Sequence, residues 1–154
     1  MRALWMLMTA ASLCLVFAAD DEEVKALPDG TGKAAVVKIC LECHGAYRFR
    51  QMRLTQDDWS NKVYDMVEQG AKGGEDELAA VVDYLTRNFG PESKVNMNTA
   101  PVQELRALLG FTTEESRAVV AYRQENRFKT WSDVMKVPGV DAQKVEAKKD
   151  AMTF

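Results

Sequence analysis

The chain has 154 residues, which is enough for one ordinary domain or two very small ones. Its 20 Lys and Arg residues stand against 23 Asp and Glu residues, so the formal net charge is −3. The single histidine excludes any centre in which two histidines of one chain bind the same metal ion.

Residues 1–19 predict a secretory signal peptide. Arg2 provides a positive start, residues 3–16 are almost entirely apolar, and small residues precede a run of acidic residues. An uncleaved membrane anchor would need about 20 apolar residues, more than this run contains. Cys14 follows Leu13, whereas lipid attachment normally requires a small residue there. We therefore expect a periplasmic or secreted protein without stable membrane insertion after cleavage.

The remaining chain divides into two halves of different charge. Residues 20–90 contain nine Lys or Arg and fourteen Asp or Glu, whereas residues 91–154 contain ten and nine. Gly90 and Pro91 lie at this change, and glycine followed by proline stops a helix. We place the domain boundary between them.

Three helices are expected in the first half. One covers residues 33–40, and another runs from about residue 75 to residue 88. Between them, Thr55 is a typical capping residue, the acidic residues after it suit the first turn of a helix, and Gly70 ends that helix. The apolar residues of this middle helix share one helical face; they are Trp59, Val63, Met66 and Val67.

The second half also predicts helices. Its start, from Asn98 to Pro101, combines a capping residue with a proline near the first helical turn. The expected helices cover about residues 101–109, 113–125, 132–136 and 141–152. No segment shows sustained alternation with a period of two, so we expect both halves to be all-α.

The run Cys40-Leu41-Glu42-Cys43-His44 has the spacing of a haem c attachment motif. Cys40 and Cys43 are expected to form thioether bonds to the vinyl groups, and His44 is expected to be the proximal iron ligand. A thioredoxin-like redox site would require a βαβ context, which this region lacks. A zinc site would require a fourth ligand besides Cys40, Cys43 and His44. We therefore predict one covalent haem c.

The ligand on the other side of the iron must be a different residue type, because His44 is the only histidine. The remaining candidates for this position are methionine, lysine, and an open or water-bound iron. Methionine is a soft ligand that raises the reduction potential, which suits electron transfer. We favour Met66, on a separate helix, over Met52, which follows His44 closely and has a maximal reach of about 26 Å. The alternative for Met66 is an ordinary core position.

The segment from about Leu27 to Gly90 resembles a small class I type cytochrome c domain. The features that carry this resemblance are the glycines before the cysteines, the Trp59, Val63, Met66 and Gly70 pattern, and a closing helix with Tyr84-Leu85. Similar single-haem domains take the distal methionine from this pattern, whereas the mitochondrial-like pattern places it in a loop before the last helix. The resemblance implies electron transfer to or from a redox partner protein.

Residues 95–154 resemble the helix-hairpin-helix domain of the ComEA competence family, which binds extracellular DNA. The matching pieces are Asn98-Thr99-Ala100, Glu104-Leu105, Ala121-Tyr122-Arg123, Phe128-Lys129 and Val137-Pro138-Gly139-Val140. The resemblance implies that backbone amides of two glycine-apolar-glycine turns hold phosphate, supported by lysine or arginine.

The two turns of this half depart from that pattern. They read Gly110-Phe111-Thr112 and Gly139-Val140-Asp141, so each second glycine is replaced and Asp141 adds a negative charge. A basic patch at helical spacing remains, although an ordinary solvated face has the same appearance. The candidate DNA contacts are Gly110, Gly139, Lys144, Lys148 and Lys149. The half lacks the basic excess typical of nucleic-acid binding.

These patterns together predict an electron-transfer protein rather than an enzyme. The second half is expected to dock the haem domain to a partner protein or to double-stranded DNA. The alternative is a DNA-binding protein whose haem has a structural or regulatory role. A peroxidase would need an open iron position with acid and base groups beside it, and no distal histidine exists.

Overall fold

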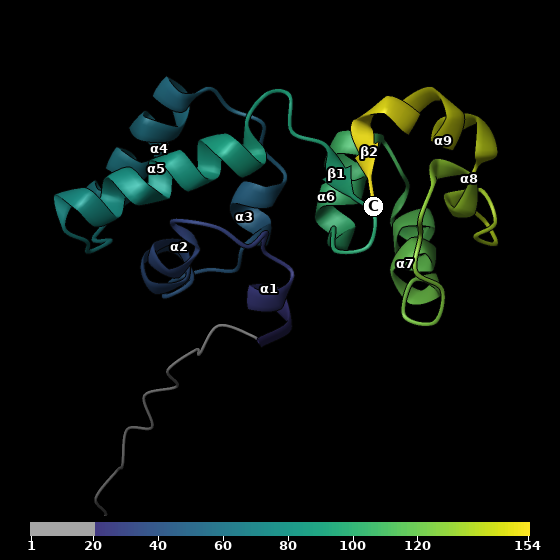
Figure 1. The fold of residues 1–154 in the computed structure, drawn as a ribbon, viewed down its shortest axis with the longest axis horizontal. Coiled ribbons are helices and arrows are strands. Elements are labelled where there is room, and N and C mark those ends of the chain that lie inside the picture. The colour runs from purple at the N-terminus through teal and green to yellow at the C-terminus, as the bar shows by residue number, and fades with distance from the viewer. Residues whose placement is uncertain (1–20) are drawn as a thin grey trace, which may run out of the picture.

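A computed structural model describes residues 21–154, so the expected signal peptide lies outside the described residues. The described chain is mostly helical, and its two halves lie side by side, with α1 to α5 in one and α6 to α9 in the other (Figure 1). From residue 21 onward, no helix combines the length and the apolar character that a membrane crossing requires.

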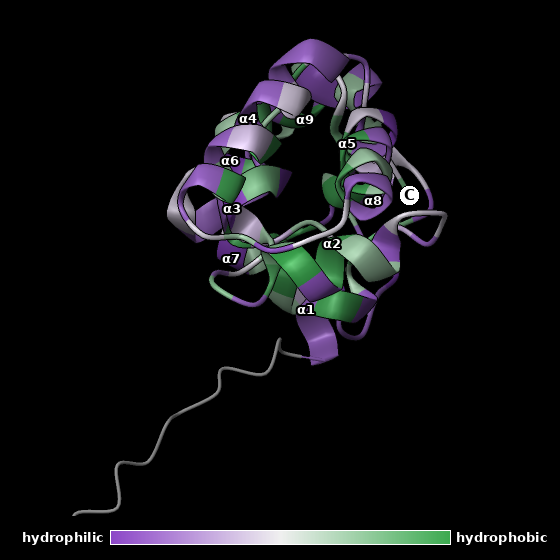
Figure 2. Cartoon of the chain, turned by 90° about the vertical axis from the view of Figure 1, so that its left-hand side faces the viewer, coloured by the Kyte–Doolittle hydropathy of each residue, from purple (hydrophilic) through white to green (hydrophobic). Residues whose placement is uncertain are grey.

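The first half contains the three expected helices and two short ones. Their bounds are α1 Asp21–Lys25, α2 Lys33–Cys40, α3 Tyr47–Arg50, α4 Gln56–Glu68 and α5 Glu75–Phe89. Helix α5 packs against both α4 and α2. The ribbon of α2 is mostly hydrophobic, whereas α1 is hydrophilic (Figure 2). The expected helices are confirmed. The sequence analysis missed α1 and α3 because each covers little more than one helical turn, so no apolar repeat can show.

Helix α4 begins where its capping sequence predicts. The Thr55 hydroxyl accepts a hydrogen bond from the backbone N–H of Asp58 at 3.2 Å. One turn into the helix, Trp59 is almost fully buried, and its indole Nε1 donates to the carbonyl oxygen of Phe89. This bond joins the start of α4 to the end of α5.

Helix α2 approaches α5 closely because Gly32 precedes it. Gly32 has a φ of 93°, in the left-handed region, and a Cβ there would collide with the carbonyl of Ala80 and with Tyr84. The hydroxyl of Tyr84 donates to the carbonyl oxygen of Pro28 at 2.6 Å. These contacts hold the segment before the cysteines against the longest helix of the first half.

The second half consists of four helices, a 3₁₀ turn and two very short strands. Their bounds are β1 Val95–Asn96, α6 Val102–Leu109, α7 Thr113–Tyr122, α8 Trp131–Val134, α9 Ala142–Lys148, the 3₁₀ turn Lys149–Ala151 and β2 Met152–Thr153. The four helices confirm the expected positions, although α7, α8 and α9 are shorter than expected.

The expectation of an all-α fold needs one correction, because β1 and β2 form a parallel pair. Val95 pairs with Met152 and Asn96 with Thr153, so the last residues close onto the start of this half. The prediction that the last helix continues to Met152 was therefore wrong, because α9 ends at Lys148. Strands of two residues show no alternation, and their pairing joins distant parts of the chain, so the sequence carried no local signal for them.

Each half has its own hydrophobic core. Trp59, Val81 and Leu85 lie in the core of the first half, and Leu105 and Phe128 lie in that of the second. The two buried clusters are separate, so the halves are joined mainly by polar contacts.

A buried ion pair joins the two halves. Glu104 of α6 has a side chain that is only 3% exposed, and its oxygens lie 2.8 Å from Arg50 Nε and 3.0 Å from Arg53 Nη2. Arg50 also donates to the carbonyl oxygens of Ala26 and Thr99, one in each half. Since all these groups bond to one another away from water, the junction is a specific contact rather than a loose link.

Candidate functional site

One cavity of the first half brings the predicted haem residues together. It has a volume of about 500 Å³, within the range of about 300 to 1,000 Å³ that is usual for cofactor pockets. Cys40, Cys43 and His44 line it, together with both methionines considered as the distal ligand, Met66 and Met52. The structure therefore places all five residues at one cavity.

The attachment motif links two helices along one wall of this cavity. Cys40 is the last residue of α2, Cys43 lies in the turn that follows, and α3 begins at Tyr47. The Nδ1 atom of His44 lies 3.2 Å from the carbonyl oxygen of Gly45. A proton on Nδ1 satisfies this contact and leaves the Nε2 lone pair for a metal ion.

Helix α4 supplies another wall. Met66 is half-buried on the same face as Trp59 and Val63, and all three line the cavity. Met52, just after α3, lines it as well. Both sulfur candidates are present, so Met66 as the distal ligand stays a prediction.

The rest of the lining is apolar apart from a few side chains. The apolar residues are Ile39, Phe49, Trp59, Val63, Ala71, Leu78, Val81 and Leu85. The charged side chains of this lining are the two cations Arg48 and Lys62. An apolar cavity with two thiols, an imidazole, two thioethers and two cations fits a haem, which is a flat apolar ring with two acidic side groups.

The thiol environment argues against a thioredoxin-like redox pair. Burial raises the pKa of the Cys40 thiol to about 11. Reactive dithiols have lowered pKa values, often at a helix N-terminus, whereas Cys40 stands at the C-terminal end of α2. The Cys40 thiol therefore lacks the lowered pKa of a reactive dithiol.

The second half contains two hairpins, each made of two helices joined by a short turn. In the first, Gly110 ends α6 with a φ of 72°, and the Thr112 side chain caps α7. In the second, Gly139 has a φ of 84°, and the Asp141 side chain caps α9 by accepting from the N–H of Gln143 at 2.8 Å. Both predicted glycines thus occupy left-handed turns, which is where glycine is favoured.

Comparison with known proteins identifies this half. Residues 90–153 match the helix-hairpin-helix motif. The second half is a helix-hairpin-helix domain. ComE operon protein 1 of Bacillus subtilis (strain 168) is 38% identical to the chain over 65 residues, which are 42% of this chain and 32% of that protein. The chain thus spans about a third of the length of this curated relative. No solved structure matches the chain.

These comparisons bear unequally on the two halves. The expectation of a helix-hairpin-helix domain similar to that of ComEA is supported. The family match begins at residue 90 and leaves the haem motif outside it. The comparisons therefore lend more support to the DNA-associating alternative than to electron carriage, and the haem stays a prediction from the motif and the cavity.

Two of the three lysines predicted as a basic patch form ion pairs with acids of the same domain. Lys144 bonds to Glu115 at 2.8 Å, and Lys149 bonds to Glu146 at 2.6 Å. Lys148 is exposed in the last turn of α9. Two of the three positive charges are therefore already paired within the helix-hairpin-helix domain.

Sequence analysis missed Glu115, which lies between the two hairpins. Its side chain is only 7% exposed. The carboxylate accepts hydrogen bonds from the N–H of Thr112 at 2.6 Å, the N–H of Asp141 at 3.2 Å and Nζ of Lys144 at 2.8 Å. The spacing from Thr112 to Glu115 is that of a capping box, so the first bond had a local signal. The bonds of Glu115 to Asp141 and Lys144 in the second hairpin had no local sequence signal.

The hydrogen bonds determine the charge state of Glu115. Burial by itself raises the pKa of this carboxyl, but the bonds from Lys144, Thr112 and Asp141 outweigh burial and lower the pKa to about 2. Glu115 is therefore ionised at neutral pH.

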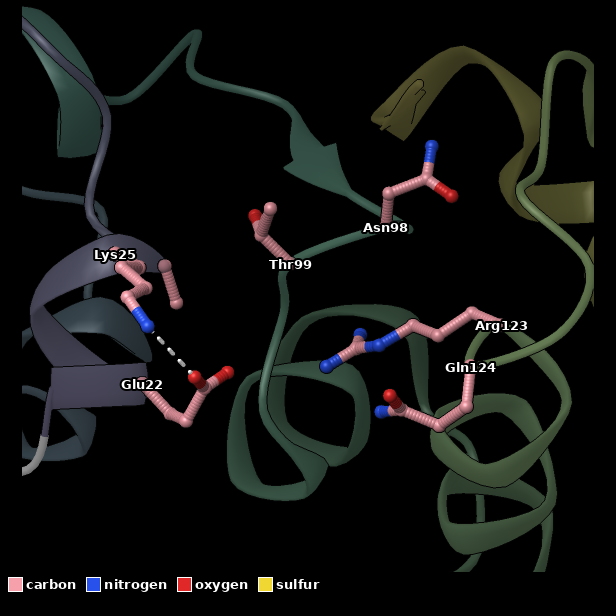
Figure 3. A pocket seen from close by; sticks show the side chains of 7 residues that line it. Glu22, Lys25, Asn98, Thr99, Arg123 and Gln124 are labelled. Carbon is pink, nitrogen blue, oxygen red and sulfur yellow. Dashed lines mark hydrogen bonds and ion pairs between the residues drawn. The ribbon is translucent and has the colours of Figure 1, made fainter.

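A second cavity, of about 430 Å³, lies at the junction of the halves (Figure 3). Several of its polar side chains already have partners in the protein. Lys25 Nζ lies 3.0 Å from Glu22, and Arg123 Nη1 donates to the carbonyl oxygens of Ala100 and Met97. None of the predicted site residues lines it.

Proposed function

We propose that the first half carries one covalent haem c and that the protein transfers single electrons outside the cytoplasm. The observation that supports this most is the meeting of Cys40, Cys43, His44 and Met66 at one apolar cavity. The haem would supply a one-electron redox centre there.

Different residues of the cavity would hold the haem in different ways. The thiols of Cys40 and Cys43 would anchor it covalently, and the imidazole of His44 would ligate the iron. The thioether of Met66, on the wall formed by α4, would supply a soft sixth ligand that favours the reduced state. Met52 is the alternative donor.

The remaining lining residues would determine the polarity and the charge around the haem. Apolar side chains such as Leu78 and Leu85 would shield a bound haem from water. Arg48 and Lys62, which line the cavity, would offer positive charge to the acidic side groups of a haem. A dry site with compensated charge favours a raised reduction potential and a small rearrangement on electron transfer.

The charge of residues 20–90 indicates the kind of redox partner. Nine basic against fourteen acidic residues give this half a negative charge. An oppositely charged partner surface would be steered toward it and would associate faster at low salt. We therefore propose a redox protein with a basic face as the partner.

Absorption spectra of the oxidised and the reduced protein test this function. A protein with His and Met ligands should show sharp bands after reduction and a weak far-red charge-transfer band when oxidised. Met66→Ala should remove the far-red band, while Met52→Ala should keep it. The reverse pattern would assign the ligand to Met52, and a protein without haem bands would contradict electron transfer.

DNA association is a second candidate function, favoured by the helix-hairpin-helix match and by the ComE-related protein. In this case the haem would have a structural or regulatory role. Binding should weaken steeply with salt, because lysine contacts to phosphate release counterions. Lys148→Ala should weaken binding to all sequences alike. A complete lack of retention of double-stranded DNA at low salt would remove this candidate.

A further inference from the structure

Glu115 is a buried acid that the haem site does not use. Its carboxylate binds the amide of Thr112 in the first hairpin, the amide of Asp141 in the second, and the ammonium group of Lys144. Backbone amides near the start of a helix, supported by lysine, form a favourable position for an anion. Here the chain fills that position with its own carboxylate.

The contacts of Glu115 extend farther along the chain than those of an ordinary helix cap. Asp133 caps α8 through the amides of Lys129 and Thr130 and pairs with Lys136, all within its own segment. Its side chain is 26% exposed, against 7% for Glu115. Glu115 instead reaches 26 and 29 residues along the chain to Asp141 and Lys144. One carboxylate therefore connects both hairpins.

The charges around this position disfavour a second anion. Besides Glu115, the side chain of Asp141 lies at the second hairpin, where it accepts from the N–H of Gln143. Lys144 is the cation paired with Glu115 there. An incoming phosphate would meet two negative charges and one positive charge, and it would find the amides of Thr112 and Asp141 already bonded.

We propose that Glu115 is an internal anion that closes the phosphate position between the two hairpins. This face then binds the DNA backbone only when the carboxylate is removed or displaced. The inference concerns how the second candidate function, DNA association, is restrained, and it is independent of the haem.

Binding of a fluorescent DNA duplex by the full chain tests the proposal. Wild type is compared with Glu115→Gln and with Glu114→Gln, an exposed neighbour whose change alters the net charge equally. Glu115→Gln should bind about tenfold more tightly than Glu114→Gln, because a repelling charge leaves the contact. Adding Lys144→Ala to Glu115→Gln should abolish the gain. Equal affinities of the two folded Gln variants would overturn the proposal.

Amide chemical shifts under the same duplex give an independent readout. In wild type the amides of Thr112 and Asp141 should not respond to DNA, whereas in Glu115→Gln they should shift. Shifts of both amides in wild type would overturn the proposal. If the Gln variant does not fold, the wild-type shifts alone test the proposal.

If wild type binds the duplex without these shifts, DNA binds through another face and the phosphate position between the hairpins is closed, as proposed. No wild-type binding, with a gain in Glu115→Gln, would remove the second candidate function and support the closed position.

Discussion

The carboxylate of Glu115 links the stability of the helix-hairpin-helix domain to pH. Its three hydrogen bonds hold its pKa at about 2, below the usual 4.5. The folded state therefore binds a proton at this group less readily than the unfolded state does. The stabilisation is complete above pH 4.5 and is lost as the pH falls toward 2.

This dependence predicts a pH-sensitive difference between wild type and Glu115→Gln. Urea denaturation should show the wild type to be more stable near neutral pH. The difference in free energy of unfolding should shrink from about pH 5 to about pH 2, as Glu115 becomes protonated in both states. A difference that stays constant over this range would show that charge on Glu115 does not stabilise the domain.

At the scale of elements, local signals predicted the longer helices and the short α8, but failed for α1, α3 and the two strands. Thr55 caps α4 and Trp59 lies on its buried face, as the spacing indicates. Helix α3 has four residues and each strand has two, which is too few for any periodicity to show. The pairing of Val95 with Met152 depends on the packed domain, so no local pattern predicts it.

The crossing of α2 and α5 predicts a specific cost for a side chain at Gly32. Gly70 is a matched control because it also has a positive φ, of 105°, but has no atom within 4 Å of an added Cβ. Gly70→Ala should cost about 1 kcal/mol from backbone strain alone. Gly32→Ala should cost about 2 kcal/mol or more, since its Cβ also collides with α5. Equal losses in thermal unfolding would show that the helices separate freely.

At the scale of the whole molecule, the cavity proposed to hold the haem and the domain junction share one segment. His44 and Arg48 line the cavity, while Arg50 and Arg53 of the same segment bind Glu104 in the other half. The sequence motif predicted the meeting of Cys40, Cys43 and His44, because they are neighbours in the chain. The junction could not be predicted in this way, since the pair between Arg50 and Glu104 is formed only by the folded halves.

Removal of Glu104 should weaken the junction strongly. Glu104→Ala leaves the buried Arg50 and the partly buried Arg53 without their acid and should cost about 3 to 5 kcal/mol of unfolding free energy. Glu146→Gln, which breaks the exposed pair with Lys149, should cost less than about 1 kcal/mol. Limited proteolysis should also cleave the link between the halves, at residues 91–94, faster in Glu104→Ala. Similar losses in the two variants would mean that the junction contributes little.

The covalent attachment of haem at Cys40 and Cys43 tests the account most directly. The protein should be produced with a haem c maturation system, denatured and extracted with acidified organic solvent. The haem spectrum should remain with the wild-type polypeptide, and it should be extracted from the variant in which both cysteines are replaced by alanine. A wild-type chain that carries no haem, or that releases it on extraction, would contradict the assignment of this cavity.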